Sequence, residues 1–235
     1  MKNDNVKYSV LITTFDKRFK NHFVPLLKEI KRQRPNLEVI VGVNGNYKKK
    51  FDEKYIKNIL IEISKYENVF PQVYTKFTSL SKQWNRGVLN SSNDLVLILN
   101  DDVTIKDGFF DFLDNQVDLT TEKGYIVLNK HFSHFFINKN FLASINWFDE
   151  RYMGIGWEDF DVDRNKVSRT TVNTKLIVHN FDTKPMQENL TGAGSGAEKY
   201  TKFNKDFYHS KWKNGGKEEV QYPYFNFEVE NYDKL

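Results

Sequence analysis

Two short apolar runs place the strongest constraint on the fold of this chain. Residues 8–14 (YSVLITT) and 94–99 (DLVLIL) are rich in β-branched and aliphatic side chains. Short continuous runs of this kind predict strands that are buried on both faces. Because helix signals lie between them, we expect a parallel sheet covered by helices, which is an α/β fold.

Strand and helix signals alternate over the first hundred residues and become less regular afterwards. The helix expected over 19–33 has apolar residues at a spacing of 3.6 and ends before Pro35. The other helices are expected over 51–66, 79–89, 138–146, 157–167 and 199–213, and the other strands over 37–43, 69–74, 125–129, 132–137 and 172–179.

The composition excludes several classes of protein. The chain of 235 residues is 39% hydrophobic and 15% aromatic, which supports a sizeable packed core and argues against disorder. It has no cysteine, so disulfides, thiol catalysis and cysteine-based zinc sites are excluded. Its 35 basic and 31 acidic side chains are interspersed, so we expect no nucleic-acid partner.

Neither a membrane span nor a signal peptide is expected. The longest apolar stretch, residues 95–99, is far shorter than the roughly 20 residues that a membrane span needs. The first ten residues contain no hydrophobic region of a signal peptide. We therefore expect a cytoplasmic protein.

An acidic turn follows the second apolar run directly. Asn100, Asp101 and Asp102 come after the strand expected over 94–99, and ligands bind beyond the carboxyl ends of strands in open parallel sheets. Carboxylates in one turn suit Mg²⁺ or Mn²⁺ shared with substrate phosphates. The alternative is a plain turn, since Asn and Asp favour turns. Residues 13–16, after the first strand, should open onto the same edge.

A second acidic cluster lies within residues 147–163 (WFDERYMGIGWEDFDVD). Such a cluster is typical of a metal site, an acid/base site or a helix N-terminus. Gly154 and Gly156 indicate a backbone that something approaches closely, and Trp157 offers a ring on which a sugar can stack. The four acids are Glu158, Asp159, Asp161 and Asp163.

Two further features bear on the function of this acidic cluster. His179 ends an expected strand and is a candidate metal ligand, although a lone histidine is more often structural. The loop over 191–199 (TGAGSGAEK) has the spacing G-x-G-x-G, which is not a dinucleotide-binding fingerprint. It predicts a mobile lid or a plain flexible loop.

Taken in order, these motifs resemble the family 2 and galactosyltransferase-type glycosyltransferases of the GT-A fold, over roughly residues 7–213. Residues 148–161 (FDERYMGIGWEDFD) are similar to the family segment FDE-x-F-x-G-x-G-x-ED-x-D. The other matching segments are NDDV (100–103) with the DxD metal motif, WNRG (84–87) with the N-x-G helix, ITTFDKR (12–18) with the first nucleotide-binding loop, and FYHSKWKNG (207–215) with the C-terminal F-x-x-KWG.

The resemblance implies one GT-A domain over 1–235. Its nucleotide-sugar-binding half, residues 1–103, would be Rossmann-like with a mostly parallel central sheet. Its acceptor-binding half, residues 104–235, would add a small antiparallel sheet, a flexible loop over 182–198 and a C-terminal helix.

The resemblance also implies roles for single residues. Asp102 and His179 would bind Mn²⁺ or Mg²⁺, Asp159 would be the catalytic base, and Glu158 would position sugar hydroxyls. Asp161 and Asp163 are left as helix-start acids and structural partners. Donor-binding positions would be Thr13, Thr14, Phe15, Asp16, Arg18, Asn44, Asn85, Arg86, Asn100 and Asp101, with Gly156 and Trp157 on the acceptor side.

Three residues depart from the family pattern. Asn100 replaces the first aspartate of DxD, Asn44 stands where an aspartate usually reads the base, and Thr13 replaces a proline. These departures bear on the identity of the nucleotide more than on the reaction.

The implied reaction is inverting, metal-dependent glycosyl transfer in polysaccharide biosynthesis. The donor would be a UDP-hexose or UDP-N-acetylhexosamine, and a hydroxyl of a glycan or lipid-linked oligosaccharide would accept the sugar in a β-glycosidic bond. The basic helix over 199–213 is a candidate for peripheral contact with the inner membrane face. Two alternatives stay open: a nucleotidyltransferase on a related sheet, and a non-catalytic sugar-binding or scaffold protein.

Overall fold

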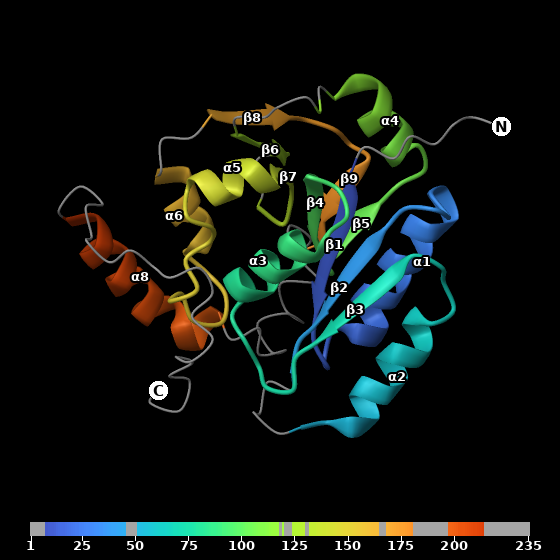
Figure 1. Ribbon diagram of the computed structural model, residues 1–235, viewed down its shortest axis with the longest axis horizontal. Coiled ribbons are helices and arrows are strands. Elements are labelled where there is room, and N and C mark those ends of the chain that lie inside the picture. The colour runs from blue at the N-terminus through green and yellow to red at the C-terminus, as the bar shows by residue number, and fades with distance from the viewer. Residues whose placement is uncertain are drawn as a thin grey trace.

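The computed structural model describes residues 8–45, 51–117, 119, 124–129, 132–164, 168–180 and 197–213. Its main sheet has seven strands in the order β3-β2-β1-β4-β7-β6-β8, and β5 and β9 form a second sheet (Figure 1). The strands are β1 (Ser9–Thr14), β2 (Val39–Val43), β3 (Val69–Val73), β4 (Leu95–Asn100), β5 (Val103–Ile105), β6 (Gly124–Leu128), β7 (His134–Asn138), β8 (Ser168–Val172) and β9 (Ile177–His179).

The main sheet is mostly parallel, as predicted. Strands β1 to β4 run in one direction, β7 pairs antiparallel with both β4 and β6, and β8 pairs parallel with β6. Only β7 is therefore reversed among the described strands of this sheet. Parallel neighbours need crossover connections, which explains why helices separate the first four strands.

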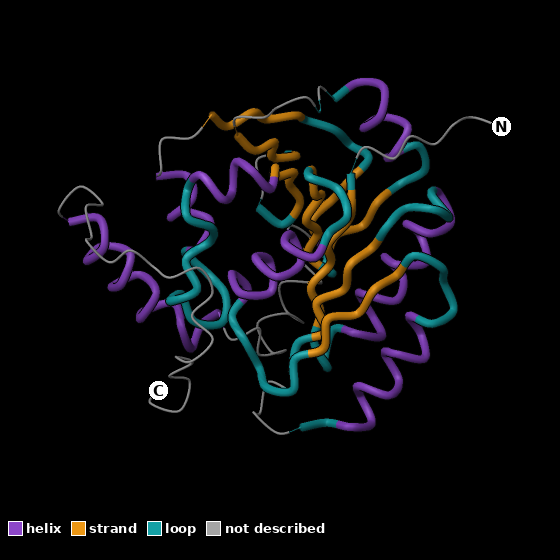
Figure 2. Tube along the Cα trace, in the orientation of Figure 1, coloured by secondary structure: helices purple, strands orange, loops and turns teal. Residues whose placement is uncertain are grey.

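Helices cover both faces of the main sheet (Figure 2). On β1, Val10 and Ile12 pack with α1, α2 and α4, whereas Leu11 points to the other face and packs with α3, α5 and α6. Burial on both faces is why the consecutive residues 10–12 of this strand are all apolar. The helical segments are η1 (Phe19–Phe23, a π-helical turn), α1 (Val24–Gln33), α2 (Glu53–Ile63), α3 (Leu80–Asn90), α4 (Phe109–Gln116), α5 (Lys139–Ser144), α6 (Glu158–Arg164) and α8 (Ala197–Lys213).

Helix α3 lies very close to β1. A Cβ added to Gly87 would lie 2.4 Å from the side chain of Leu11, a distance that no real contact allows. Trp84, one turn earlier, is buried with its ring edge-to-face against Phe135 at 5.3 Å. The glycine of the WNRG motif therefore serves close packing of helix on strand.

The small antiparallel sheet of the second half is confirmed, but the strand expected over 172–179 is wrong. That segment contributes the end of β8 and the whole of β9, which belong to different sheets. The Asn129 side chain holds the turn between them: it accepts a hydrogen bond from Thr174 N at 2.7 Å and donates one to Ile177 O at 3.0 Å. Strand β5 and helix α4 were not predicted.

The C-terminal helix is confirmed as α8, whereas residues 182–196 of the expected flexible loop lie outside the described residues. Residues 214–215 of the C-terminal motif lie outside them too. No helix in the described ranges has the length and apolar character needed to cross a membrane.

Candidate functional site

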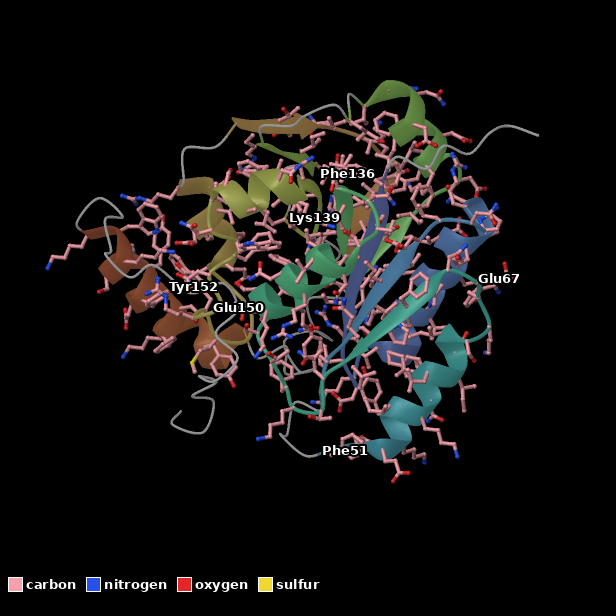
Figure 3. The ribbon with its side chains drawn as sticks, viewed as in Figure 1. Phe51, Glu67, Phe136, Lys139, Glu150 and Tyr152 are labelled. Carbon is pink, nitrogen blue, oxygen red and sulfur yellow. The ribbon has the colours of Figure 1, made fainter. Side chains whose placement is uncertain are left out.

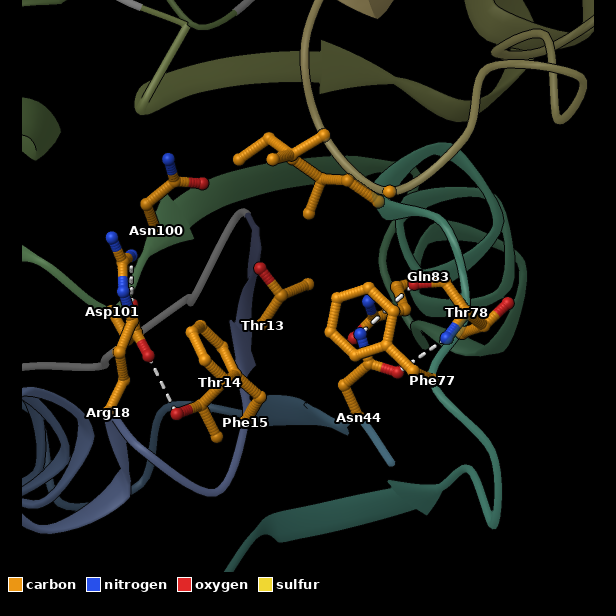
Figure 4. Close-up of a pocket in the computed structure, with 13 residues that line it drawn as sticks. Thr13, Thr14, Phe15, Arg18, Asn44, Phe77, Thr78, Gln83, Asn100 and Asp101 are labelled. Atoms are coloured by element: carbon orange, nitrogen blue, oxygen red, sulfur yellow. Dashed lines mark hydrogen bonds and ion pairs between the residues drawn. The ribbon is translucent and has the colours of Figure 1, made fainter. Parts of the chain in front are cut away.

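An open pocket lies at the carboxyl ends of β1, β2 and β4 (Figure 4). This is where the strand order predicts a ligand site in an open parallel sheet. Seven of the predicted donor-binding residues line it: Thr13, Thr14, Phe15, Arg18, Asn44, Asn100 and Asp101. Asp16, Asn85 and Arg86 are not among its lining residues.

Asp101 is buried and uses both of its oxygens inside the protein. Thr14 Oγ1 donates to Oδ2 at 2.7 Å, and Arg18 Nη1 donates to Oδ1 at 2.9 Å. Asp101 therefore ties the loop after β1 to the turn after β4, and with 2% of its surface exposed it offers little access to a ligand.

Asp102 and His179 were both predicted as metal ligands. They are far apart in the sequence but lie side by side in the structure. The register of β5 and β9 pairs Val103 with His179, and Asn180 N donates to Asp102 O at 2.9 Å. As a result His179 Nε2 lies 3.4 Å from Asp102 Oδ1. Burial alone would raise the pKa of Asp102, but His179 and Arg18 beside the carboxylate lower it to about 2.

The Asp102 and His179 pair fits a divalent cation. Asp102 Oδ1 is buried without a hydrogen-bond partner in the part of the chain that the structure describes, and it faces the imidazole nitrogen. Carboxylate oxygen and imidazole nitrogen both suit Mn²⁺. Within the described ranges no cluster of three or more such groups is present. The remaining ligands would be water and substrate phosphate, as is usual for Mg²⁺ and Mn²⁺.

Asn44 and Asn85 both act inside the protein. Asn44 Oδ1 accepts from Gly45 N and Thr78 N at 2.9 and 2.8 Å, and its Nδ2 donates to Thr78 O at 3.0 Å. Asn85 donates to Phe148 O at 2.9 Å and accepts from Phe148 N at 3.0 Å. Asn44 therefore fixes the floor of the pocket (Figure 4), and Asn85 fixes the segment that begins at Phe148.

The other predicted donor-side residues divide between the pocket and its surroundings. Asn100 lines the pocket, and its buried Oδ1 has no hydrogen-bond partner among the described residues. Asp16 is half-buried on the loop before η1. Arg86 is half-buried on α3, where its carbonyl accepts from Gln72 Nε2 at 3.2 Å.

The sequence did not identify the residues that close the far side of the pocket. Phe77 stands edge-to-face with Phe15, with ring centroids 6.3 Å apart. The strand-end rule, applied to β3, would have found Phe77 and Thr78. The unpredicted lining residues are Phe77, Thr78, Leu80, Gln83, Gly154 and Ile155.

Glu158 and Asp159 begin helix α6 and lie outside the lining of this pocket. Glu158 is 5% exposed, and burial together with the neighbouring charge of Asp159 raises its pKa to about 8. Burial also raises the pKa of Asp159, although its Oδ1 accepts from Phe160 N at 3.0 Å. Two adjacent carboxyls with raised pKa values are typical of sites that exchange protons.

Asp161 and Asp163 are structural partners, as expected. Asp161 Oδ1 accepts from Trp212 Nε1 at 2.8 Å, and Asp161 Oδ2 lies 2.7 Å from Lys211 Nζ. Asp163 pairs with Arg169 at 2.9 Å and accepts from the hydroxyl of Tyr125. The acidic segment is thus divided between two carboxyls with raised pKa values and two anchors.

Helix α8 holds the loop that reaches the pocket. Asn204 is fully buried, accepts from Met153 N at 2.9 Å, and donates to Met153 O and Gly156 O at 2.9 and 2.8 Å. A Cβ on Gly154 would lie 2.3 Å from Tyr200. Glu150 and Tyr152, which precede this loop, lie between α3 and α8 (Figure 3).

Trp157 packs on aromatic rings of α6 and α8. Its ring centroid lies 5.1 Å from that of Phe160, 5.3 Å from that of Tyr208 and 5.8 Å from that of His209. Trp157 has a φ of +76°, and Gly156 before it has a φ of +108°. A left-handed tryptophan is uncommon and costs energy, so the surrounding contacts must hold this turn.

No protein-family model matches this sequence, and no curated protein matches it. Solved structures do resemble the fold. TarS 1–349 from S. aureus aligns with a TM-score of 0.53 and 14% identity, over 73% of this chain and 59% of that one. The mannosyltransferase PcManGT from Pyrobaculum calidifontis, in complex with GDP-Man and Mn²⁺, aligns with a TM-score of 0.57 and 12% identity, over 76% and 58% of the two chains.

A cytidylyltransferase from Leptospira borgpetersenii is also similar, with a TM-score of 0.53 and 10% identity over 72% of this chain and 77% of that one. At these identities the likeness shows the fold, and the predicted GT-A fold is confirmed. This chain spans less than two thirds of TarS 1–349 and of PcManGT, so their whole length is not represented in it.

Proposed function

We propose that this protein is a glycosyltransferase that moves a sugar from a nucleoside-diphosphate sugar to a hydroxyl of an acceptor. The observation that carries the proposal is the 3.4 Å approach of His179 Nε2 to Asp102 Oδ1, next to a pocket at the strand ends. A pocket for a nucleotide beside a carboxylate and imidazole pair suits a diphosphate with a divalent cation. The complexes of PcManGT with GDP-Man and Mn²⁺, and of TarS 1–349 with UDP, support this reading.

Asp102 and His179 would hold Mn²⁺ or Mg²⁺. When bound, the cation supplies positive charge for the diphosphate leaving group. The lowered pKa of Asp102 keeps its carboxylate ionised at neutral pH, so the ligand is ready without a prior loss of a proton.

The donor would lie along the carboxyl ends of β1, β2 and β4. The rings of Phe15 and Phe77 offer apolar surface for a base, and Asn100 offers an amide to the sugar or phosphate side. We expect a UDP-hexose or UDP-N-acetylhexosamine. Asp101, Asn44 and Asn85 would act by holding the walls of the site rather than by touching the donor.

Asp159 would be the catalytic base, and Glu158 would orient sugar hydroxyls. A pKa raised by burial makes Asp159 a stronger base than an exposed aspartate. Asp159 would take the proton of the acceptor hydroxyl as that oxygen attacks C1 of the sugar from the face opposite the diphosphate. A single displacement inverts the anomeric carbon, so an α-linked donor gives a β-glycoside. Gly156 and Trp157 would border the acceptor.

The deciding experiment is titration of UDP with and without Mn²⁺, followed by a screen of nucleotide sugars for Mn²⁺-dependent hydrolysis. Mn²⁺-dependent binding of UDP together with hydrolysis of one donor would support a glycosyltransferase. The absence of metal-dependent nucleotide binding would favour a non-catalytic scaffold. The variant Asp159→Asn should lose transfer while keeping donor binding, and unchanged transfer would remove Asp159 as the base.

The likeness to a cytidylyltransferase gives a second candidate, a nucleotidyltransferase. Such enzymes usually carry a glycine-rich, basic first loop, and the loop over 12–18 (ITTFDKR) has no glycine. A nucleotidyltransferase would release pyrophosphate from a nucleoside triphosphate when a sugar phosphate is supplied. Detection of pyrophosphate in that reaction would support this candidate.

The acceptor would be a glycan or a lipid-linked oligosaccharide. Helix α8 exposes Lys202, Lys205 and Lys213, which gives it a basic outer surface for contact with anionic lipid. Flotation with vesicles that contain anionic lipid tests this contact. Recovery of the protein only in the unbound fraction would contradict it.

A further inference from the structure

We infer that Arg18 is the internal counter-ion of Asp101 and Asp102 and that it competes with the divalent cation for Asp102. This inference rests on the proposed function. A single nitrogen, Arg18 Nη1, lies 2.9 Å from Asp101 Oδ1 and 3.1 Å from Asp102 Oδ2. The three side chains belong to residues that are only 9%, 2% and 3% exposed, so water screens their charges weakly.

The charges of this cluster decide how strongly a cation is attracted. With both carboxyls ionised, the two aspartates and the guanidinium together carry one net negative charge. Both oxygens of Asp101 accept a hydrogen bond, and Asn100 supplies no charge. Asp102 Oδ1 has no hydrogen-bond partner among the described residues, so Asp102 is the carboxylate better placed for a cation. Arg18 therefore lowers the affinity of this carboxylate for a cation as long as it stays paired with Asp102.

Arg18 is also placed to contact the donor. It lines the pocket, and its guanidinium carbon lies 5.5 Å from the centre of the Phe15 ring. Its Nε is buried and has no hydrogen-bond partner in the described ranges, so the guanidinium is not saturated. The planar fork of a guanidinium matches two phosphate oxygens at once.

These observations predict that binding of the nucleotide and binding of the cation are coupled through Arg18. A bound diphosphate draws the Arg18 fork away from Asp102, and the freed carboxylate then binds the cation more strongly. Nucleotide and metal would consequently each raise the affinity for the other, as linkage requires. Arg18 is a positioning residue in this scheme, because its effect on the cation passes through Asp102.

The test measures the affinity for Mn²⁺ alone and with saturating UDP, by electron paramagnetic resonance of free Mn²⁺. The variant Arg18→Gln should bind Mn²⁺ alone roughly tenfold more tightly, because a positive charge close to the metal is removed. The gain in Mn²⁺ affinity that UDP produces should shrink by a similar factor. Arg18→Lys keeps the charge and should stay near the wild-type affinity for Mn²⁺ alone.

Arg34→Gln is the matched control, since Arg34 also pairs with two aspartates, Asp111 and Asp114, but at the surface of the protein. Arg34→Gln should leave unchanged the affinity for Mn²⁺ alone and the affinity for Mn²⁺ with saturating UDP. If Arg18→Gln does not fold, Arg18→Met, which keeps the aliphatic stem, takes its place with the same expected result. Unchanged or weaker binding of Mn²⁺ alone in these variants overturns the inference, provided that the wild type binds Mn²⁺ and UDP. Failure of the wild type to bind either one refutes the proposed function instead.

Discussion

Lys211 Nζ lies 2.7 Å from Asp161 Oδ2, so a cation near the end of α8 neutralises an acid of the segment that begins α6. The same ammonium lies 2.8 Å from Asp149 Oδ2, and Trp212 Nε1 donates to Asp161 Oδ1 at 2.8 Å. The acidic segment and the C-terminal KW pair are therefore one structural unit. This unit sets the position of Glu158 and Asp159, which lie in the same turn of α6 as Asp161.

Replacing Lys211 by methionine should destabilise the fold strongly. The change removes the cation that Asp149 and Asp161 share, although Asp149 keeps its ion pair with Arg151 at 2.7 Å. Loss of one partner of a buried pair costs about 3 to 5 kcal/mol, and the remaining pair should place the loss at the lower end of this range. Both carboxylates are well buried, with side chains 7% and 5% exposed. Urea unfolding measures the loss.

Lys213→Met is the control for this change, because Lys213 is exposed on the same helix. It should alter the free energy of unfolding by no more than about 0.5 kcal/mol. Equal losses for the two lysines would mean that the ion pairs of Lys211 contribute nothing to stability.

The raised pKa of Glu158 predicts that the free energy of unfolding falls as the pH rises. Its pKa is raised from about 4.5 to about 8 in the folded protein, first by burial and then by the charge of Asp159. Between these two values the folded state holds a proton that the unfolded state has released. The contribution of this carboxyl to the free energy of unfolding is therefore fully present below about pH 4.5, and it is lost as the pH rises towards 8.

Urea unfolding of the wild type and of Glu158→Gln at pH 5, 6.5 and 8 measures this effect. The difference between the two proteins reports Glu158 together with its interaction with the charge of Asp159. The wild type should lose a few kcal/mol more than the variant between the lowest and the highest pH, since one pKa unit corresponds to about 1.4 kcal/mol. Parallel curves would show that the carboxyl is ionised throughout.

The strands and the edge that holds the pocket could be predicted, because apolar runs and the strand-end rule depend only on local sequence. Thr13, Thr14 and Asn100 were found in this way. The resemblance named Asp102 and His179 together, but their approach depends on pairing between β5 and β9, which lie more than 70 residues apart in sequence. The sequence had also merged β9 with the end of β8, because no turn signal separates them.

The amide clamps could not be predicted. Three asparagine side chains each accept a hydrogen bond from a backbone N–H, and donate one to a backbone carbonyl, of a residue far away in the chain. They are Asn44, Asn85 and Asn204. A sequence does not show whether an asparagine side chain faces a ligand or a distant peptide group. For this reason Asn44 and Asn85 were both expected to contact the donor, although only Asn44 lines the pocket, and Asn204 was not singled out.

Asn204→Ala should loosen the loop over 153–156. The change removes three hydrogen bonds and leaves Met153 N, Met153 O and Gly156 O without this partner. A backbone group left unsatisfied in a fully buried position costs about 1 to 3 kcal/mol. Met153 and Gly156 are half-buried, so the total loss should be about 2 kcal/mol. Thermal unfolding measures it.

The exposed residue Asn140 provides the comparison, because its side chain lies at the surface of α5. Asn140→Ala should unfold at the wild-type temperature. If Asn204→Ala did so as well, water would be replacing the clamp, and the loop would not depend on α8.

Gly87→Ala should destabilise the protein by about 1 to 3 kcal/mol, the usual cost of overpacking a core. The new methyl group would meet the side chain of Leu11 at 2.4 Å, and Leu11 lies on β1, an inner strand of the main sheet. A double-mutant cycle with Leu11→Ala identifies the cause. The two changes should couple favourably, because the shortened side chain makes room for the methyl group. Purely additive losses would point to a different contact.

Asp102 and His179 should behave as one unit towards the cation. If both hold the same ion, Asp102→Asn and His179→Gln should each weaken Mn²⁺-dependent binding of UDP by about tenfold or more, and the double variant should lose little beyond the worse single one. The expectation follows from the distance of 3.4 Å between His179 Nε2 and Asp102 Oδ1. Asp107→Asn makes the same charge change at a side chain that is 87% exposed, and it should have no effect. Binding that survives in His179→Gln would assign the imidazole to holding Asp102 in place, and strictly additive losses would place the two residues in separate sites.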